Sequence, residues 1–150
     1  MNNDRLNDLI IGYDDSVGIF YQNSHGSLSA MKSKYSGHYE RIDGIAAGDF
    51  NNDALTDIAI SYSGSNIVSI MLQKFNGAFD YRTIEFSKVI PANINRVIMS
   101  GDINADKRED IAIGTDKGVF VLLQNNSGSF APVERIPLLT DYIATGLDID

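Results

Sequence analysis

Apolar side chains occur along this chain in short runs, and each run ends at a cluster of Gly, Asn, Asp or Ser. The runs are about 4 to 8 residues long and rich in β-branched residues, which is typical of strands. No stretch has the spacing of a convincing amphipathic helix, so we predict an all-β protein. The predicted strands are 42–47, 58–62, 67–73, 79–86, 96–101, 111–115, 118–124, 130–136 and 142–147.

The same pattern recurs about every 50 residues, which indicates a repeat architecture. Segments 3–11, 52–60 and 105–113 align with one another, and a Gly-containing turn follows further along each copy. The repeats span approximately 1–41, 42–94 and 95–141, and 142–150 begins a further one.

A full repeat predicts one antiparallel sheet of four strands, which we name A to D in chain order. The first repeat has only B, C and D, and a strand A follows the third repeat, so the order is BCD-ABCD-ABCD-A. Sheets of this kind favour the blades of a β-propeller, which typically closes at about 4 to 8 blades. We expect one propeller domain, partial or completed by oligomerisation, with a β-sandwich as the alternative fold.

The loop between strands A and B carries side-chain oxygens at its positions 1, 3, 5 and 9. Calcium takes six to eight oxygen ligands, and a backbone carbonyl at position 7 would complete such a set. The EF-hand is excluded because its bidentate Glu would fall on Ile60 or Ile113, inside predicted strands. The alternative is that these loops form polar turns and nothing more. The predicted calcium ligands are Asp49, Asn51, Asp53, Leu55 and Asp57 in one loop, and Asp102, Asn104, Asp106, Arg108 and Asp110 in the next.

A third copy of this loop is divided between the two ends of the sequence. Its predicted ligands are Asn2, Asp4, Leu6 and Asp8 at the start, with Asp148 and Asp150 at the end. Either Asp148 or Asp150 fits position 1. Two expectations follow: a fragment of a longer propeller, or a homo-oligomer in which the last strand A completes the first blade of a partner chain.

Composition narrows the function classes. The net charge of −8 argues against nucleic acid as a partner, and half of the 20 acidic residues fall at the loop positions. No apolar run is long enough to span a membrane, the N-terminus does not read as a signal peptide, and Cys-based sites are excluded. No catalytic motif was found, so we do not expect an enzyme.

The two full loops, with the strands 57–60 and 110–113 and the turns 75–79 and 126–130, resemble FG-GAP and VCBS-type repeats, the blades of the integrin α-subunit propeller. The resemblance implies a noncatalytic, calcium-stabilised propeller, extracellular or at the cell surface, that serves adhesion or binds protein or glycan ligands. The sequence departs from the family at loop position 6, where Gly is usual and Arg5, Ala54 and Lys107 stand here. Because these residues resist φ > 0, we expect weaker calcium binding.

Family members commonly bind ligands with the B–C and D–A loops, at the end of the blades opposite the calcium loops. The candidate ligand-binding residues there are Tyr13, Tyr35, His38, Tyr39 and Tyr62. The alternative is that these rings only cap strand ends. A segment of a polysaccharide lyase or hydrolase, and a structural spacer in a larger protein, are the alternative functions.

Overall fold

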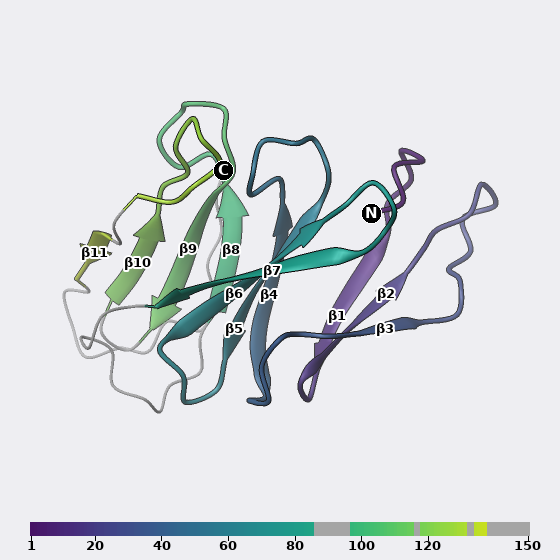
Figure 1. Cartoon of the computed structure of the whole chain (residues 1–150), viewed down its shortest axis with the longest axis horizontal. Coiled ribbons are helices and arrows are strands. Elements are labelled where there is room, and N and C mark those ends of the chain that lie inside the picture. Colours follow the sequence, from purple (N-terminus) through teal and green to yellow (C-terminus); the bar gives the residue numbers. More distant parts are fainter. Residues whose placement is uncertain (86–96, 116–117, 132–133, 138–150) are drawn as a thin grey trace.

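The computed structural model describes residues 1–85, 97–115, 118–131 and 134–137, and within them the secondary structure is entirely β (Figure 1). Three antiparallel sheets follow one another along the chain. The first contains β1 (Leu9–Tyr13), β2 (Ser16–Phe20) and β3 (Lys32–Tyr35). The second contains β4 (Ile42–Gly48), β5 (Asp57–Tyr62), β6 (Ile67–Gln73) and β7 (Phe79–Glu85). The third contains β8 (Val97–Gly101), β9 (Asp110–Thr115), β10 (Gly118–Leu122) and β11 (Glu134–Ile136).

Neighbouring strands in each sheet are neighbours in the sequence, in the orders β1-β2-β3, β4-β5-β6-β7 and β11-β10-β9-β8. These orders confirm the predicted all-β class and the succession BCD-ABCD-ABCD. The last predicted strand, 142–147, lies outside the described residues. Of strand D of the third sheet, predicted at 130–136, the described residues form the strand Glu134–Ile136 and an isolated bridge between Phe130 and Gln124.

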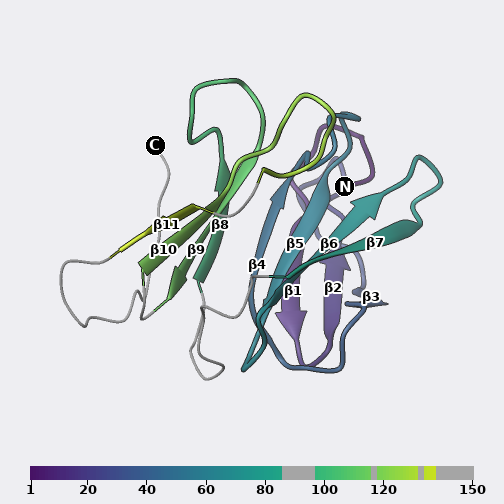
Figure 2. The same ribbon diagram turned by 60° about the vertical axis from the view of Figure 1, so that its left-hand side comes forward.

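The middle sheet is buried on both faces, because alternate side chains of a strand point to opposite sides. In β5, Ile58 and Ile60 pack in a core shared with Val17 and Ile19 of the first sheet. The intervening Ala59 belongs to a second core, which includes residues of the third sheet. The sheets are therefore packed side by side, as Figures 1 and 2 show, and an apolar core lies between neighbouring sheets.

The first strand of the middle sheet, β4, contacts both β1 and β8. The approach to β1 is close: a Cβ added to Gly12 would lie 2.6 Å from Cγ2 of Ile42. This arrangement suits propeller blades, but the described residues form three sheets and no closed ring. In the same part of the chain, no helix is long and apolar enough to cross a membrane.

Candidate functional site

The loop between β4 and β5 is organised by its own acidic and amide side chains. The Asp49 carboxylate accepts hydrogen bonds from the backbone amides of Asp53 (3.1 Å) and Ala54 (2.8 Å). The Oδ1 atom of Asn51 accepts from the same Asp53 amide at 3.0 Å. Loop positions 1 and 3 therefore direct oxygens at one backbone group and lie close together.

The next residues of the loop form further turns of this type. Asp53 Oδ1 accepts from the amide of Leu55 at 2.8 Å, and Asp53 Oδ2 accepts from Asn51 Nδ2 at 2.9 Å. Side chains of Asn and Asp favour such bonds to the backbone two residues on. The alternating Asp and Asn residues thus specify the shape of the loop locally.

The loop between β8 and β9 repeats this scaffold. The amides of Asp106 (2.9 Å) and Lys107 (2.7 Å) donate to Asp102, and the Asp106 amide also donates to Asn104 Oδ1 at 3.1 Å. In the first loop, the amide of Asp4 donates to Asn2 Oδ1 at 3.3 Å. Three segments far apart in the sequence therefore adopt one arrangement.

The loop backbone is left-handed at two positions in every copy. Position 6 has φ of 67° at Arg5, 64° at Ala54 and 69° at Lys107. Position 4 is left-handed as well, with φ of 62° at Asn52 and 61° at Ala105. Position 6 thus adopts a left-handed conformation that Gly reaches most easily. The side chains present here make this conformation more costly.

Position 9 is a buried carboxylate that joins the loop to strand C. Asp57 is fully buried, and its carboxylate accepts from the amides of Phe50 (3.0 Å) and Gln73 (2.7 Å). Burial raises the pKa of Asp57 to about 7 against the opposing effect of these two amides, and the nearby charges of Asp53 and Asp49 raise it further. Carboxylates of one loop therefore repel each other electrostatically.

The other copies hold position 9 in the same way. Asp110 is also fully buried and accepts from the amides of Ile103 (3.0 Å) and Gln124 (2.8 Å). Asp8 accepts from the amide of Gln22 at 2.9 Å, and its other oxygen lies 3.0 Å from the amino group of Met1. These bonds give the recurring Asp a structural role beside the predicted ligand role.

The predicted ligand residues of each complete loop are thus gathered around one short segment of backbone. Asp148 and Asp150 lie outside the described residues. Within the described ranges, no three His, Cys, Asp or Glu side chains form a group that could hold a metal ion by themselves. The predicted sets also include an amide oxygen and a carbonyl, which are hard oxygen donors of the kind that calcium accepts.

The first and second loops are each also held by a Gln from the following sheet, a contact that the sequence analysis missed. Gln124 Nε2 donates to the carbonyl of Asp49 at 2.8 Å, and Gln73 Nε2 donates to the carbonyl of Met1. Both Gln side chains are buried, and the Oε1 atom of each has no hydrogen-bond partner. The recurrence of Gln at the end of strand C was the available signal, and an inter-sheet contact is its physical reason.

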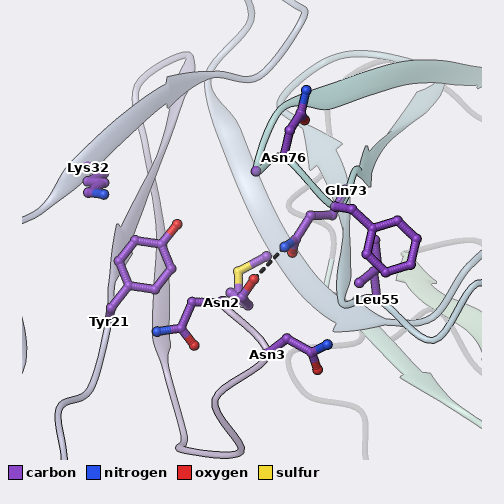
Figure 3. A pocket seen from close by; sticks show the side chains of 10 residues that line it. Asn2, Asn3, Tyr21, Lys32, Leu55, Gln73 and Asn76 are labelled. Carbon is purple, nitrogen blue, oxygen red and sulfur yellow. Dashed lines mark hydrogen bonds between the residues drawn. The ribbon is translucent and has the colours of Figure 1, made fainter.

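A hollow of about 470 Å³ opens at this loop end, between the first and second sheets. Figure 3 shows Asn2, Asn3 and Gln73 around it, with Tyr21 and Lys32 on one side and Asn76 on the other. The Lys32 ammonium lies 5.0 Å from the centre of the Tyr21 ring. The walls of the hollow therefore combine amides with the rings of Tyr21 and Phe75 and the ammonium of Lys32.

The candidate ligand residues at the other end of the blades are unequal in exposure. Tyr39 is 89% exposed, and its ring centre lies 5.5 Å from that of the partly exposed Tyr35. His38 lies 3.0 Å from Glu40 Oε2, and the Tyr13 hydroxyl donates to Ser33 at 2.6 Å. Tyr35 thus ends β3, and His38 and Tyr39 follow it on the segment between β3 and β4.

Tyr62 is fully buried, and its hydroxyl donates to the carbonyl of Ser36 at 3.0 Å. Its ring packs in the core between the first two sheets. A buried ring cannot stack on a ligand at the surface. Tyr62 therefore belongs to the core.

The fold and the loops define a repeat protein of antiparallel β-sheets, each with an Asp- and Asn-rich loop between its first two strands or at its start. Residues 1–60 match the family model of the FG-GAP-like repeat. This match confirms the FG-GAP-type resemblance read from the sequence. No curated protein matches the chain.

Proposed function

We propose that this chain is a noncatalytic calcium-binding module of the β-propeller type, which presents a recognition surface for a protein or glycan. The observation that carries the calcium part is the repeated scaffold: the same backbone amides fix the oxygens of loop positions 3 and 5 in all three copies, and the oxygens of position 1 in both complete loops. Polar turns alone would not require the same oxygen at each position of two complete loops.

In the second loop, Asp49, Asn51, Asp53, Asp57 and the carbonyl of Leu55 would hold the ion. Calcium, when bound, supplies positive charge to a loop whose carboxylates repel each other. The corresponding residues of the third loop are Asp102, Asn104, Asp106, Asp110 and the carbonyl of Arg108. Because the ion binds the folded loop and not the unfolded chain, calcium would stabilise the protein by mass action.

Thermal unfolding in calcium and in chelator tests this proposal. We expect calcium at about 100 times its dissociation constant to add about 2.7 kcal/mol per site. The double variant Asp49→Asn, Asp102→Asn keeps one of the two acceptor oxygens in each loop and should lose most of this gain, measured as the difference between calcium and chelator. The control is Asp80→Asn, whose carboxylate lies on β7 and pairs with Lys74. Identical melting curves with calcium and with chelator would contradict the proposal.

The recognition part of the proposal is supported by the exposed rings of Tyr35 and Tyr39 at the end of the blades away from the loops. Aromatic rings with a polar tip are common in binding surfaces. Binding of the purified chain to immobilised glycans and to extracellular-matrix proteins tests it, with Tyr39→Ala as the variant and Phe75→Ala as the control. Phe75 is equally exposed, at 87%, but stands in the turn between β6 and β7.

An extracellular or cell-surface location follows from the same proposal, because FG-GAP repeats are typical of extracellular proteins. Calcium there is plentiful, and loops with an affinity of about 10⁻⁴ to 10⁻³ M are characteristic of extracellular modules. The left-handed non-Gly residues at position 6 accord with sites of modest affinity.

A further inference from the structure

The two complete loops differ at position 7, where calcium would use only a backbone carbonyl. In the second loop this residue is Leu55, whose side chain is buried and 6% exposed. In the third loop it is Arg108, whose amide keeps the same place and donates to Asp106 Oδ1 at 3.0 Å. The side chain at this position is therefore free to vary without changing the scaffold.

The Arg108 guanidinium turns back onto its own loop. Its Nη2 atom forms an ion pair with Asp106 Oδ2, a carboxylate of the predicted calcium ligand set. In the second loop, the matching oxygen of Asp53 accepts from the neutral amide of Asn51 instead. The carboxylate at position 5 therefore pairs with a positive charge in the third loop and with a neutral donor in the second.

Two further bonds fix this guanidinium in place. Arg108 Nε donates to the carbonyl of Gln124 at 3.0 Å, and Nη1 donates to Asn126 Oδ1 at 2.6 Å. An exposed ion pair usually contributes little, because ordering two long side chains costs entropy. Here two other bonds already order the side chain, and the planar fork of Arg suits such a multiple contact.

We propose that Arg108 is a built-in counter-cation that makes the loop 102–110 a weaker calcium site than the loop 49–57. The proposal rests on the calcium binding put forward above. An ion entering the third loop meets a fixed positive charge beside a ligand carboxylate and must displace it or bind next to it. The chain would then fill one site at low calcium and the other only at higher calcium.

Calcium titration of the chelator-stripped full chain by calorimetry, at constant ionic strength, tests this proposal. We expect two binding steps that differ about tenfold or more in affinity, with the weaker one assigned to the third loop. Arg108→Leu should tighten the weaker step about tenfold and leave the other unchanged. Leu55→Arg should weaken the tighter step. Arg41→Leu is the charge-matched control, because Arg41 pairs with Asp43 outside the loops.

Thermal melting separates this role from a purely structural one. Without its guanidinium, Asp106 loses its counter-charge, so Arg108→Leu should melt lower than the parent in chelator and recover in calcium. Arg108→Met gives the same test with an unbranched side chain if the Leu variant folds poorly. Equal affinities in the parent chain, or an unchanged weaker step in both variants, would overturn the role of Arg108. An absence of binding in every variant would instead overturn the calcium proposal itself.

Discussion

The loops 49–57 and 102–110 share one backbone but differ in their surroundings. Both have left-handed residues at positions 4 and 6, and both anchor a buried Asp at position 9. The second loop is held from outside by Gln124 and by the turn that contains Gly128, whereas the third loop carries its own cation in Arg108. The comparison shows that the Asp and Asn side chains of a loop set its shape, that the side chain at position 7 sets its charge, and that contacts from the next sheet support it.

The largest effect is expected at the feature that the two loops share. Asp57→Ala leaves the buried amides of Phe50 and Gln73 without an acceptor, which should cost about 2 to 4 kcal/mol of unfolding free energy in chelator. Asp110→Ala should cost a similar amount, and Asp57→Asn less because one acceptor remains. Urea unfolding measures these losses, with Asp80→Ala as the exposed control. A large difference between the stability losses of Asp57→Ala and Asp110→Ala would show that the two loops are not equivalent.

The next effect should separate the two loops. Gly128 has φ of 70°, and a Cβ there would lie 2.4 Å from the carbonyl oxygen of Asn51. Gly77 has φ of 76° with nothing within 4 Å of its added Cβ. Both Ala variants adopt a strained backbone, costing about 1 kcal/mol, but Gly128→Ala must also displace the second loop, at a further cost of about 1 to 3 kcal/mol. Thermal melting of both variants compares them directly, and equal losses would show that the turn does not support the loop.

A smaller loss is expected where Gln124 joins the two sheets. Gln124→Met removes the bond to the Asp49 carbonyl and a longer one to the Glu109 carbonyl. It also removes an unpartnered buried Oε1, so the net cost should be about 1 kcal/mol. Hydrogen exchange of the amides in 49–57 should rise more than that of the amides in 102–106. Uniform exchange across both loops would argue against Gln124 as a specific support of the second loop.

The smallest expected effect is a gain in stability. Ala54→Gly and Lys107→Gly place the residue that favours φ > 0 at loop position 6, which should stabilise the protein by up to about 1 kcal/mol each. The matched control is Ala47→Gly in β4, where the same change should destabilise by a similar amount. Denaturant midpoints measure all three, and a loss in the two loop variants would show that the left-handed backbone is not strained.

The strand order and most strand limits followed from the sequence, because alternating apolar runs and Gly-containing turns specify them locally. Strand C of the middle sheet, 67–73, was predicted with its observed limits. Contacts between sheets could not be derived in this way: the burial of Tyr62, the Gln124 bond and the approach of Gly128 depend on how whole sheets pack. Arg108 was expected to offer only its carbonyl, since spacing does not show where a side chain turns.

The most direct test of the central claim is a crystal structure of the full chain grown with calcium. The account predicts an ion in the loop 49–57 at about 2.3 to 2.6 Å from oxygens of Asp49, Asn51, Asp53 and Asp57 and from the Leu55 carbonyl, identified by its anomalous signal. A loop that keeps its internal hydrogen bonds and holds no ion at millimolar calcium would contradict it.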